Sequence, residues 1–126
     1  MKLIYIAGPY RAKGEWQVVE NIRRAEAIAL EVWRLGAACI CPHKNTAFFN
    51  GSLPDQVWLD GDLEIVRRCD AILCAPGWER SVGSLGEIAL ARQLGLPVFN
   101  STVELKEWLA TMDSAPARPL PDPVAT

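Results

Sequence analysis

CDAILCAPGWERSVGSLGEIALA, residues 69–91, is the stretch of this chain that says most about its architecture. Residues 70–75 form a short apolar run, which is typical of a strand covered on both faces in a parallel sheet. Pro76 and Gly77 end this strand, and from about Ser84 onward good helix formers predict a helix. A strand, a glycine-containing loop and a helix in this order bring a ligand to the carboxyl end of a parallel sheet.

Glu87 lies in this predicted helix in unusual surroundings. The residues three and four positions away on a helix are small or apolar: Gly83, Ser84, Leu90 and Ala91. Because these neighbours share one face with Glu87, we expect its carboxylate to be shielded from solvent. The alternative is an ordinary acid in a first helical turn, which the helix dipole stabilises by about 0.3–1 kcal/mol.

Asp62 repeats this pattern in a helix predicted over residues 55–68, for which Asp55 is the expected N-cap. The residues three and four positions from Asp62 are all apolar: Trp58, Leu59, Ile65 and Val66. A fully solvated Asp62 would break the amphipathic pattern, so we expect it to face the interior. The alternative is a structural carboxylate whose hydrogen bonds are satisfied within the fold.

Apolar runs and helical patterns alternate along the rest of the chain. Strands are expected over residues 2–7, 37–41 and 98–99, helices over 15–35 and 102–112, and a loop over 43–54. This alternation predicts an α/β fold with a doubly wound parallel sheet of four to five strands, flavodoxin/Rossmann-like, in a single domain over residues 1–112. Residues 113–126 hold four of the nine prolines, which predicts a flexible Pro/Ala-rich tail.

The composition excludes several classes of protein. Of the 126 residues, 50% are hydrophobic and 22% charged, and the net charge is −2, so the basic excess of a nucleic-acid binder is missing. The first apolar run ends at Gly8 and Pro9, too early for a signal-peptide core or a membrane span. We therefore expect a cytoplasmic protein whose partners include neither a membrane nor a nucleic-acid polymer.

The four cysteines are expected to be buried free thiols. Cys39, Cys41 and His43 form a Cys-x-Cys-Pro-His run, for which a metal site is the alternative. This run lacks the paired Cys-x-x-Cys spacing of structural zinc sites, so we expect neither a metal nor another cofactor.

The carboxyl ends of the predicted strands, with the adjoining helices, would gather one set of polar residues: Tyr5, Gly8, Arg11, His43, Asn45, Asp62, Ser81, Gly83 and Glu87. Two carboxylates beside a polar cleft are suited to cleaving a glycosidic bond, since one can attack or stabilise the anomeric carbon and the other can transfer protons. The Tyr5 hydroxyl is apt to orient one of them, although a core tyrosine is the alternative. Ser81, Gly83 and Ser84 begin a helix and favour an anion there, unless Ser81 is a plain N-cap.

Several motifs together resemble a known superfamily. They are Tyr5-Ile6-Ala7-Gly8-Pro9, Asp62-Leu63-Glu64, Cys69-Asp70-Ala71-Ile72-Leu73, Ser81-Val82-Gly83-Ser84-Leu85-Gly86-Glu87 and Ala91. Over about residues 2–100 the chain resembles the nucleoside 2-deoxyribosyltransferase-like superfamily, in particular a bacterial and phage branch related to the 2'-deoxynucleoside 5'-monophosphate N-hydrolases. The Ser-x-Gly-x-x-x-Glu spacing is the most specific part of the resemblance.

The resemblance implies an N-glycosidase or deoxyribosyltransferase that acts on a small-molecule nucleoside or nucleotide, with hydrolysis slightly favoured. Glu87 would be the nucleophile that forms a glycosyl–enzyme intermediate, Tyr5 would orient it, and Asp62 would assist departure of the base or hold the sugar. The substrate would contact Gly8, Arg11, Ser81 and Gly83, and Trp78 would line or cover the pocket; His43 and Asn45 are further candidates from the sheet edge. The superfamily also implies a homodimer or higher homo-oligomer.

Two other classes of function stay open from the sequence. A non-catalytic nucleotide-binding module could keep this fold without turnover, since a fold does not specify chemistry. An interaction protein could use the five tryptophans as a contact surface, although core packing explains them equally well.

Overall fold

The computed structural model describes residues 1–112; the tail expected over 113–126 lies outside the described residues. The elements, in chain order, are β1 (Leu3–Ala7), α1 (Glu15–Arg34), β2 (Ala38–Ile40), α2 (Pro42–Asn45), α3 (Asp55–Arg67), β3 (Ala71–Cys74), a 3-10 turn (Trp78–Arg80), α4 (Val82–Gln93), β4 (Val98–Phe99) and α5 (Thr102–Met112).

The four strands form one parallel sheet in the order β2-β1-β3-β4. β1 and β3 are the central pair, and residues 4–7 of β1 lie opposite residues 71–74 of β3. Each strand is joined to the next strand in the chain by a crossover that contains a helix, as parallel pairing requires. The prediction of a doubly wound α/β domain with four to five parallel strands is therefore confirmed, with four strands in the described residues.

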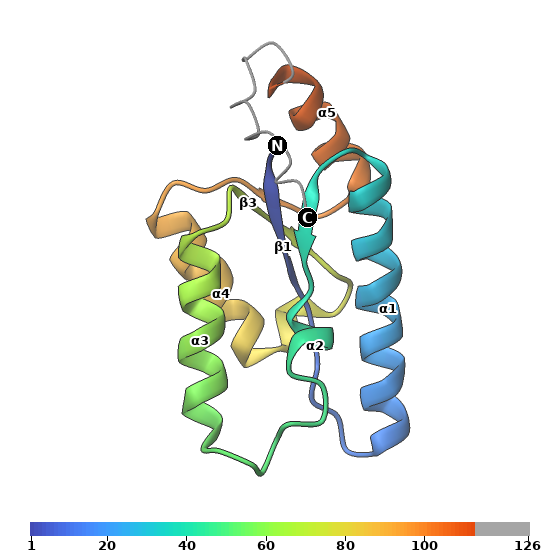
Figure 1. Ribbon diagram of the computed structural model, residues 1–126, viewed down its shortest axis with the longest axis vertical. Helices are drawn as coiled ribbons and strands as arrows, with labels where there is room; N and C mark the ends of the chain where they lie inside the picture. The colour runs from blue at the N-terminus through green and yellow to red at the C-terminus, as the bar shows by residue number, and fades with distance from the viewer. Residues whose placement is uncertain (113–126) are drawn as a thin grey trace, which may run out of the picture.

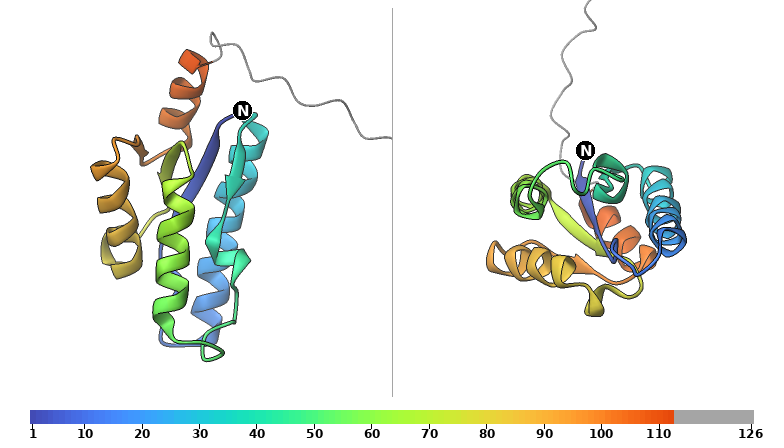
Figure 2. Two further views of the ribbon diagram at one scale, coloured as in Figure 1. Left: turned by 60° about the vertical axis from the view of Figure 1, so that its left-hand side comes forward. Right: turned by 90° about the horizontal axis from the view of Figure 1, so that it is seen from below.

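Helices cover both faces of the sheet (Figures 1 and 2). Ile4 and Ile6 point to the face that α1 and α5 cover, where Ala29, Val32 and Leu105 complete the core. The alternate strand residues point to the opposite face, against α3 and α4: Tyr5, Ala7, Ile72 and Cys74, packed with Val66, Ile88 and Ala91. Because neighbouring strand residues face opposite sides, the apolar β1 and β3 runs contribute to both cores.

The strand order reverses direction between β1 and β3, because the chain crosses from β1 over the α1 face and from β3 over the α4 face. In doubly wound sheets, ligands bind at such a switch point, at the carboxyl ends of the strands. These ends form the lower end of the sheet in Figure 1. The backbones approach closely there: a Cβ on Gly8 would lie 2.7 Å from the Cβ of Ala75. Glycine therefore allows the β1 loop to pass next to the end of β3.

Three local predictions were wrong in detail. α4 begins at Val82 instead of about Ser84, because the Ser81 side chain accepts a hydrogen bond from the Ser84 backbone N–H at 3.3 Å and caps the helix. Residues 43–45, expected to begin a loop, form the short helix α2 together with Pro42, its first position. Asp55 is not the N-cap of α3; Pro54 holds that position, and the Asp55 carboxylate pairs with Arg11 at 3.0 Å.

Among residues 1–112, no helix is both long and apolar enough to span a membrane.

Candidate active site

A buried phenol and a buried carboxyl group meet on the α3/α4 face of the sheet. Tyr5, in the middle of β1, is completely buried, and its hydroxyl donates a hydrogen bond to Glu87 Oε2. Glu87 lies in the second turn of α4 and is 8% exposed. The pairing joins residues 82 positions apart in the chain.

The surroundings of Glu87 favour its neutral form. Burial raises the pKa of Glu87 to about 8, the hydrogen bond from Tyr5 opposes this rise, and the nearby charge of Asp62 adds to it. The pKa of Tyr5 is also raised, chiefly by burial and then by the Glu87 and Asp62 charges, so the phenol keeps its proton and acts as a donor. A carboxyl group of this kind is typical of functional sites as well as of some structural networks.

Asp62, on α3, is the second carboxyl group of the site. It is partly buried, and burial raises its pKa to about 6. Its charge acts on both Glu87 and Tyr5, so the three groups form one electrostatic unit. Two coupled carboxyl groups lose their protons in two steps, and an intermediate pH therefore leaves one proton on the pair. This arrangement can supply a carboxylate nucleophile and a proton donor at the same time.

The start of α4 lies beside this unit. The Ser84 side chain is 1% exposed, and its hydroxyl donates to Ser81 Oγ at 3.0 Å, so the two serines are linked. Gly83 is partly buried, and a Cβ added there would lie 3.8 Å from Leu59 Cδ2 of α3. The free backbone N–H groups of this first turn favour an anion. Ser81 is thus an N-cap and also lies at the end of α4 nearest the switch point.

His43 holds the loop that follows β1. Its imidazole is 4% exposed, and Nε2 lies 3.1 Å from the carbonyl oxygens of both Gly8 and Pro9. Since carbonyls only accept, Nε2 carries the proton and Nδ1, 3.9 Å from Cys41 Sγ, is the unprotonated nitrogen. Burial lowers the pKa of His43, which keeps the ring neutral.

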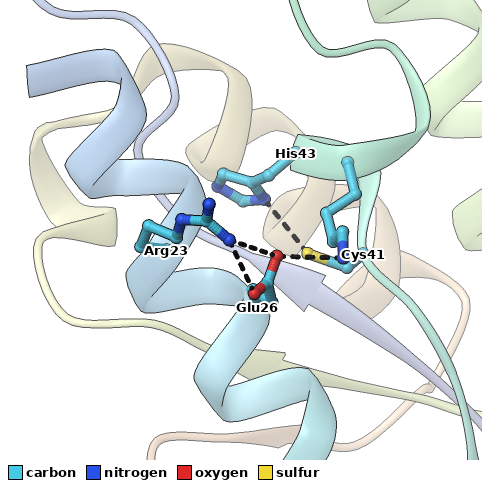
Figure 3. Close-up of polar contacts among 5 residues, drawn as sticks. Arg23, Glu26, Cys41 and His43 are labelled. Carbon is cyan, nitrogen blue, oxygen red and sulfur yellow. Dashed lines mark hydrogen bonds and ion pairs between the residues drawn. The ribbon is translucent and has the colours of Figure 1, made fainter. Parts of the chain in front are cut away.

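Figure 3 shows His43 and Cys41 beside an ion-pair cluster. Arg23 and Lys44 contact the Glu26 carboxylate at 3.1 and 2.9 Å, and these cations lower the pKa of Glu26. Arg23 and Glu26 lie on α1 and Lys44 on α2, and α1 covers the face of the sheet opposite to that of Tyr5. Among the described residues, no group of three or more His, Cys, Asp or Glu side chains is arranged to hold a metal ion.

Three other sequence-predicted residues lie apart from the carboxyl pair or at its margin. Arg11 is exposed and pairs with Asp55. Asn45 is exposed and lines a groove of about 540 Å³ between α1 and β2, together with Trp33 and Lys44. Trp78, in the 3-10 turn after β3, packs against the α3/α4 core and is partly buried.

Sequence reasoning assigned Trp58 only to the apolar side of α3. The structure shows more: the Trp58 ring packs against Phe49, with ring centroids 5.8 Å apart, and its Nε1 atom is buried without a hydrogen-bond partner among the described residues. The sequence position of Trp58 could have indicated its place near the site. Trp58 precedes Asp62 by four residues, so the two side chains lie on the same face of the helix.

Comparisons with known proteins agree with this fold. A family model described as Domain of unknown function (DUF7768) matches residues 2–101. No curated protein sequence matches the chain. Among solved structures, a 2-deoxyribosyltransferase from the psychrotolerant bacterium Bacillus psychrosaccharolyticus is similar, with a TM-score of 0.59 and 21% identity over 76% of this chain and 69% of that enzyme. That enzyme is a biocatalyst for the industrial synthesis of antiviral and antitumoral nucleosides. At this identity the likeness shows a shared fold.

Proposed function

The chain belongs to the DUF7768 family, and we propose that it cleaves the N-glycosidic bond of a nucleoside or deoxynucleoside, or of its 5'-monophosphate, through a covalent glycosyl–Glu87 intermediate. The observation that carries the proposal is the buried hydrogen bond from the Tyr5 hydroxyl to Glu87, with Asp62 coupled to both groups. The fold shared with a nucleoside-handling 2-deoxyribosyltransferase supports it.

In the proposed first step, the ionised Glu87 attacks C1' of the sugar. A C–O bond to the carboxylate forms as the C1'–N bond breaks, and the base leaves with the bonding electron pair. Asp62 supplies the proton that the departing base needs, and the Tyr5 hydroxyl keeps the Glu87 carboxylate in position by its hydrogen bond. The reacting form therefore has Glu87 ionised and Asp62 protonated, which is the less populated of the two singly protonated states because the pKa of Glu87, about 8, lies above that of Asp62, about 6.

In the proposed second step, water hydrolyses the glycosyl ester or a second base displaces it. Asp62, now ionised, takes the proton from the water, and Glu87 leaves as a carboxylate. We favour hydrolysis slightly. The two routes share the first step, so the roles of Glu87, Tyr5 and Asp62 are the same in both.

The proposed substrate lies across the switch point. The N-terminus of α4, with Ser81 and Gly83, suits a 5'-phosphate or the sugar hydroxyls. Gly8 lets the β1 loop approach the ligand, and Trp78 forms part of the wall. Arg11 would reach a phosphate only by leaving its exposed pair with Asp55, which is a weak interaction. We assign His43 to the support of the β1 loop, and Asn45 remains a candidate for the outer rim.

We further propose that the protein is cytoplasmic and forms a homodimer or higher homo-oligomer, as the superfamily resemblance implies. Sedimentation of the full chain at micromolar concentration tests the second point. A monomer at every concentration would overturn it and leave the chemistry at Glu87 untouched.

The test of the proposed function is chromatographic detection of free base from a panel of deoxynucleosides, ribonucleosides and their 5'-monophosphates. The full-length protein is expected to release base, and Glu87→Ala is expected to lower the rate about a thousandfold or more. Asp62→Asn should slow release for bases that leave only when protonated. Glu64→Gln, which alters an exposed carboxylate on α3, is the matched control and should leave the rate unchanged.

Two outcomes contradict the proposal. Base release that survives Glu87→Ala removes Glu87 from the chemistry. If no nucleoside or nucleotide in the panel is cleaved but a nucleotide raises the melting temperature of the protein, a non-catalytic nucleotide-binding module is favoured.

A further inference from the structure

An unpaired donor lies beside the candidate active site. The Trp58 Nε1 atom is buried and has no hydrogen-bond partner among residues 1–112. A buried N–H without an acceptor is destabilising, because the group gives up its hydrogen bond to water and gains none. Native proteins leave few such groups, and each one calls for a physical reason.

The position of Trp58 relates this donor to Asp62. Both residues are on α3, and a spacing of four puts them on one face, about one helical turn apart. In the proposed mechanism Asp62 protonates the leaving base, so the base must lie next to Asp62. A base at that point is within one helical turn of the Trp58 indole.

The segment over residues 46–53 covers the indole loosely. It passes from α2 to α3 at the lower end of Figure 1, and its Phe49 ring lies at a tilt of 56° to the Trp58 ring. Phe48 and Phe49 are 57% and 48% exposed, which is unusual for neighbouring aromatic side chains. Phe48 also has a φ of 61°, a strained left-handed conformation for an aromatic residue.

The backbone of this segment is held by local hydrogen bonds: the Phe49 N–H donates to the Thr46 carbonyl at 3.1 Å, and the Phe49 carbonyl accepts from the Ser52 N–H at 3.0 Å. The Phe48 N–H joins the segment to the β1 loop by donating to the Tyr10 hydroxyl at 2.7 Å. Because the Phe49 side chain is half exposed, it can rotate away from Trp58 while these backbone hydrogen bonds stay in place. The movement of Phe49 would open the buried face of the indole.

We propose that Trp58 is a specificity-determining residue of the site: its indole N–H donates a hydrogen bond to an acceptor atom of the nucleobase, which enters as Phe49 moves aside. The inference rests on the proposed function for the identity of the ligand. A nucleobase fits because it combines a flat apolar surface, against which Phe49 can pack, with acceptors at its edge for the Trp58 N–H. A phosphate would instead favour the N-terminus of α4.

The direct test follows the indole protons of the five tryptophans by ¹H–¹⁵N NMR in the full-length Glu87→Gln protein, which should bind without turnover. The probes are the four common 2'-deoxynucleoside 5'-monophosphates, and Trp58→Phe identifies the Trp58 signal. We expect one probe or more to move that signal downfield, while the signal of Trp33, exposed on α1, stays in place. Binding that shifts other resonances and leaves Trp58 unmoved would overturn the inference.

A kinetic test separates this inference from the proposed function. If the wild-type protein releases base, Trp58→Phe is expected to lower kcat/KM about tenfold, mostly through KM, and the control Trp33→Phe is expected to leave it unchanged. The loss should vanish for the one analogue that lacks the contacted acceptor, in a panel of 3-deaza and 7-deaza purines, 3-deazacytosine and bases without one exocyclic carbonyl oxygen.

If Trp58→Phe lowers kcat/KM equally for every analogue, Trp58 has a packing role. That result overturns the inference and leaves the proposed function intact. A protein that releases no base but shows the Trp58 shift retains the inference and loses the proposed function.

Discussion

At the scale of single residues, the main feature is a carboxyl group kept where its charge is unfavourable. Glu87 is buried against a phenol, and Asp62 adds a second negative charge nearby. Both features lower the stability of the folded protein when Glu87 is ionised. A buried carboxylate loses its hydration, and one hydrogen bond compensates for that loss only in part. Such groups are typical of sites where chemistry, and not stability, determines the residue.

Glu87 is expected to make stability depend on pH. Its folded pKa of about 8 lies above its ordinary value of 4.5, so the folded state binds the proton more tightly. Protonation of Glu87 therefore stabilises the folded state. This contribution to the free energy of unfolding is fully present below pH 4.5 and is lost as the pH rises through 8. Urea unfolding at pH 5 and pH 9 should show a lower free energy of unfolding at pH 9.

The matched variants identify the source of this dependence. Glu87→Gln should remove most of the decline in the free energy of unfolding above pH 6. The smaller decline that Asp62 causes should remain below that pH, because its folded pKa is about 6. Glu64→Gln changes an exposed carboxylate and should behave as the wild type. A decline of unchanged size in Glu87→Gln would mean that another group binds the proton.

Tyr5→Phe is expected to shift the pH dependence of base release. The Tyr5 hydroxyl lowers the pKa of Glu87 by its hydrogen bond, so its removal raises that pKa further and leaves less ionised nucleophile at neutral pH. We expect kcat/KM at pH 7 to fall about ten- to a hundredfold, with a smaller loss relative to the wild type at higher pH. A pH–rate profile that falls by the same factor at every pH, without a shift of its alkaline limb to higher pH, would contradict this role.

At the scale of secondary-structure elements, the close approach of β1 to β3 defines the switch point. Gly8→Ala would bring a new Cβ to 2.7 Å from the Ala75 Cβ, and the Ala75 backbone N–H is itself bonded to the Ala7 carbonyl at 2.7 Å. Because neither backbone has room to shift, we expect a loss of about 1–3 kcal/mol in the free energy of unfolding.

Two further variants make the Gly8 prediction specific. Ala75→Gly removes the opposing Cβ, so the double variant Gly8→Ala/Ala75→Gly should recover part of the lost stability. Gly61→Ala, in an exposed turn of α3 with no atom within 4 Å of the new Cβ, should stabilise by about 0.5–1 kcal/mol. If Gly8→Ala and Gly61→Ala changed the free energy of unfolding equally, the cause would be the entropy of the unfolded chain and not the contact with Ala75.

At the scale of the whole molecule, the described residues build one core on each face of the sheet. We propose that residues 1–112 form a domain that folds by itself. A protein that ends at Met112 is expected to unfold in one cooperative transition, with a free energy of unfolding and a rate of base release close to those of the full chain. A lower melting temperature, or loss of base release alone, would show that residues 113–126 contribute to the core or to the site.

The fold class and the buried environment of Glu87 could both be predicted from the amino-acid sequence. Apolar strand runs alternating with helical periodicity required two helix layers around a parallel sheet, because each element must bury its apolar face. The same periodicity indicated that Glu87 and Asp62 face inward, since a residue's neighbours on a helix follow from a fixed spacing. Helix starts were less predictable: Ser81 and Ser84 are both acceptable near an N-cap, and hydrogen-bond geometry selects Ser81.

Only the tertiary structure decided which of these groups meet. The strand order puts β1 in the centre, and this order brings the Tyr5 hydroxyl to a carboxylate 82 residues away. It also pairs Arg11 with Asp55, turns His43 toward the Gly8 carbonyl, and leaves the Trp58 N–H without a partner within residues 1–112. The physical reason is that local periodicity fixes which face of an element is buried, whereas the partner on that face depends on how distant elements pack.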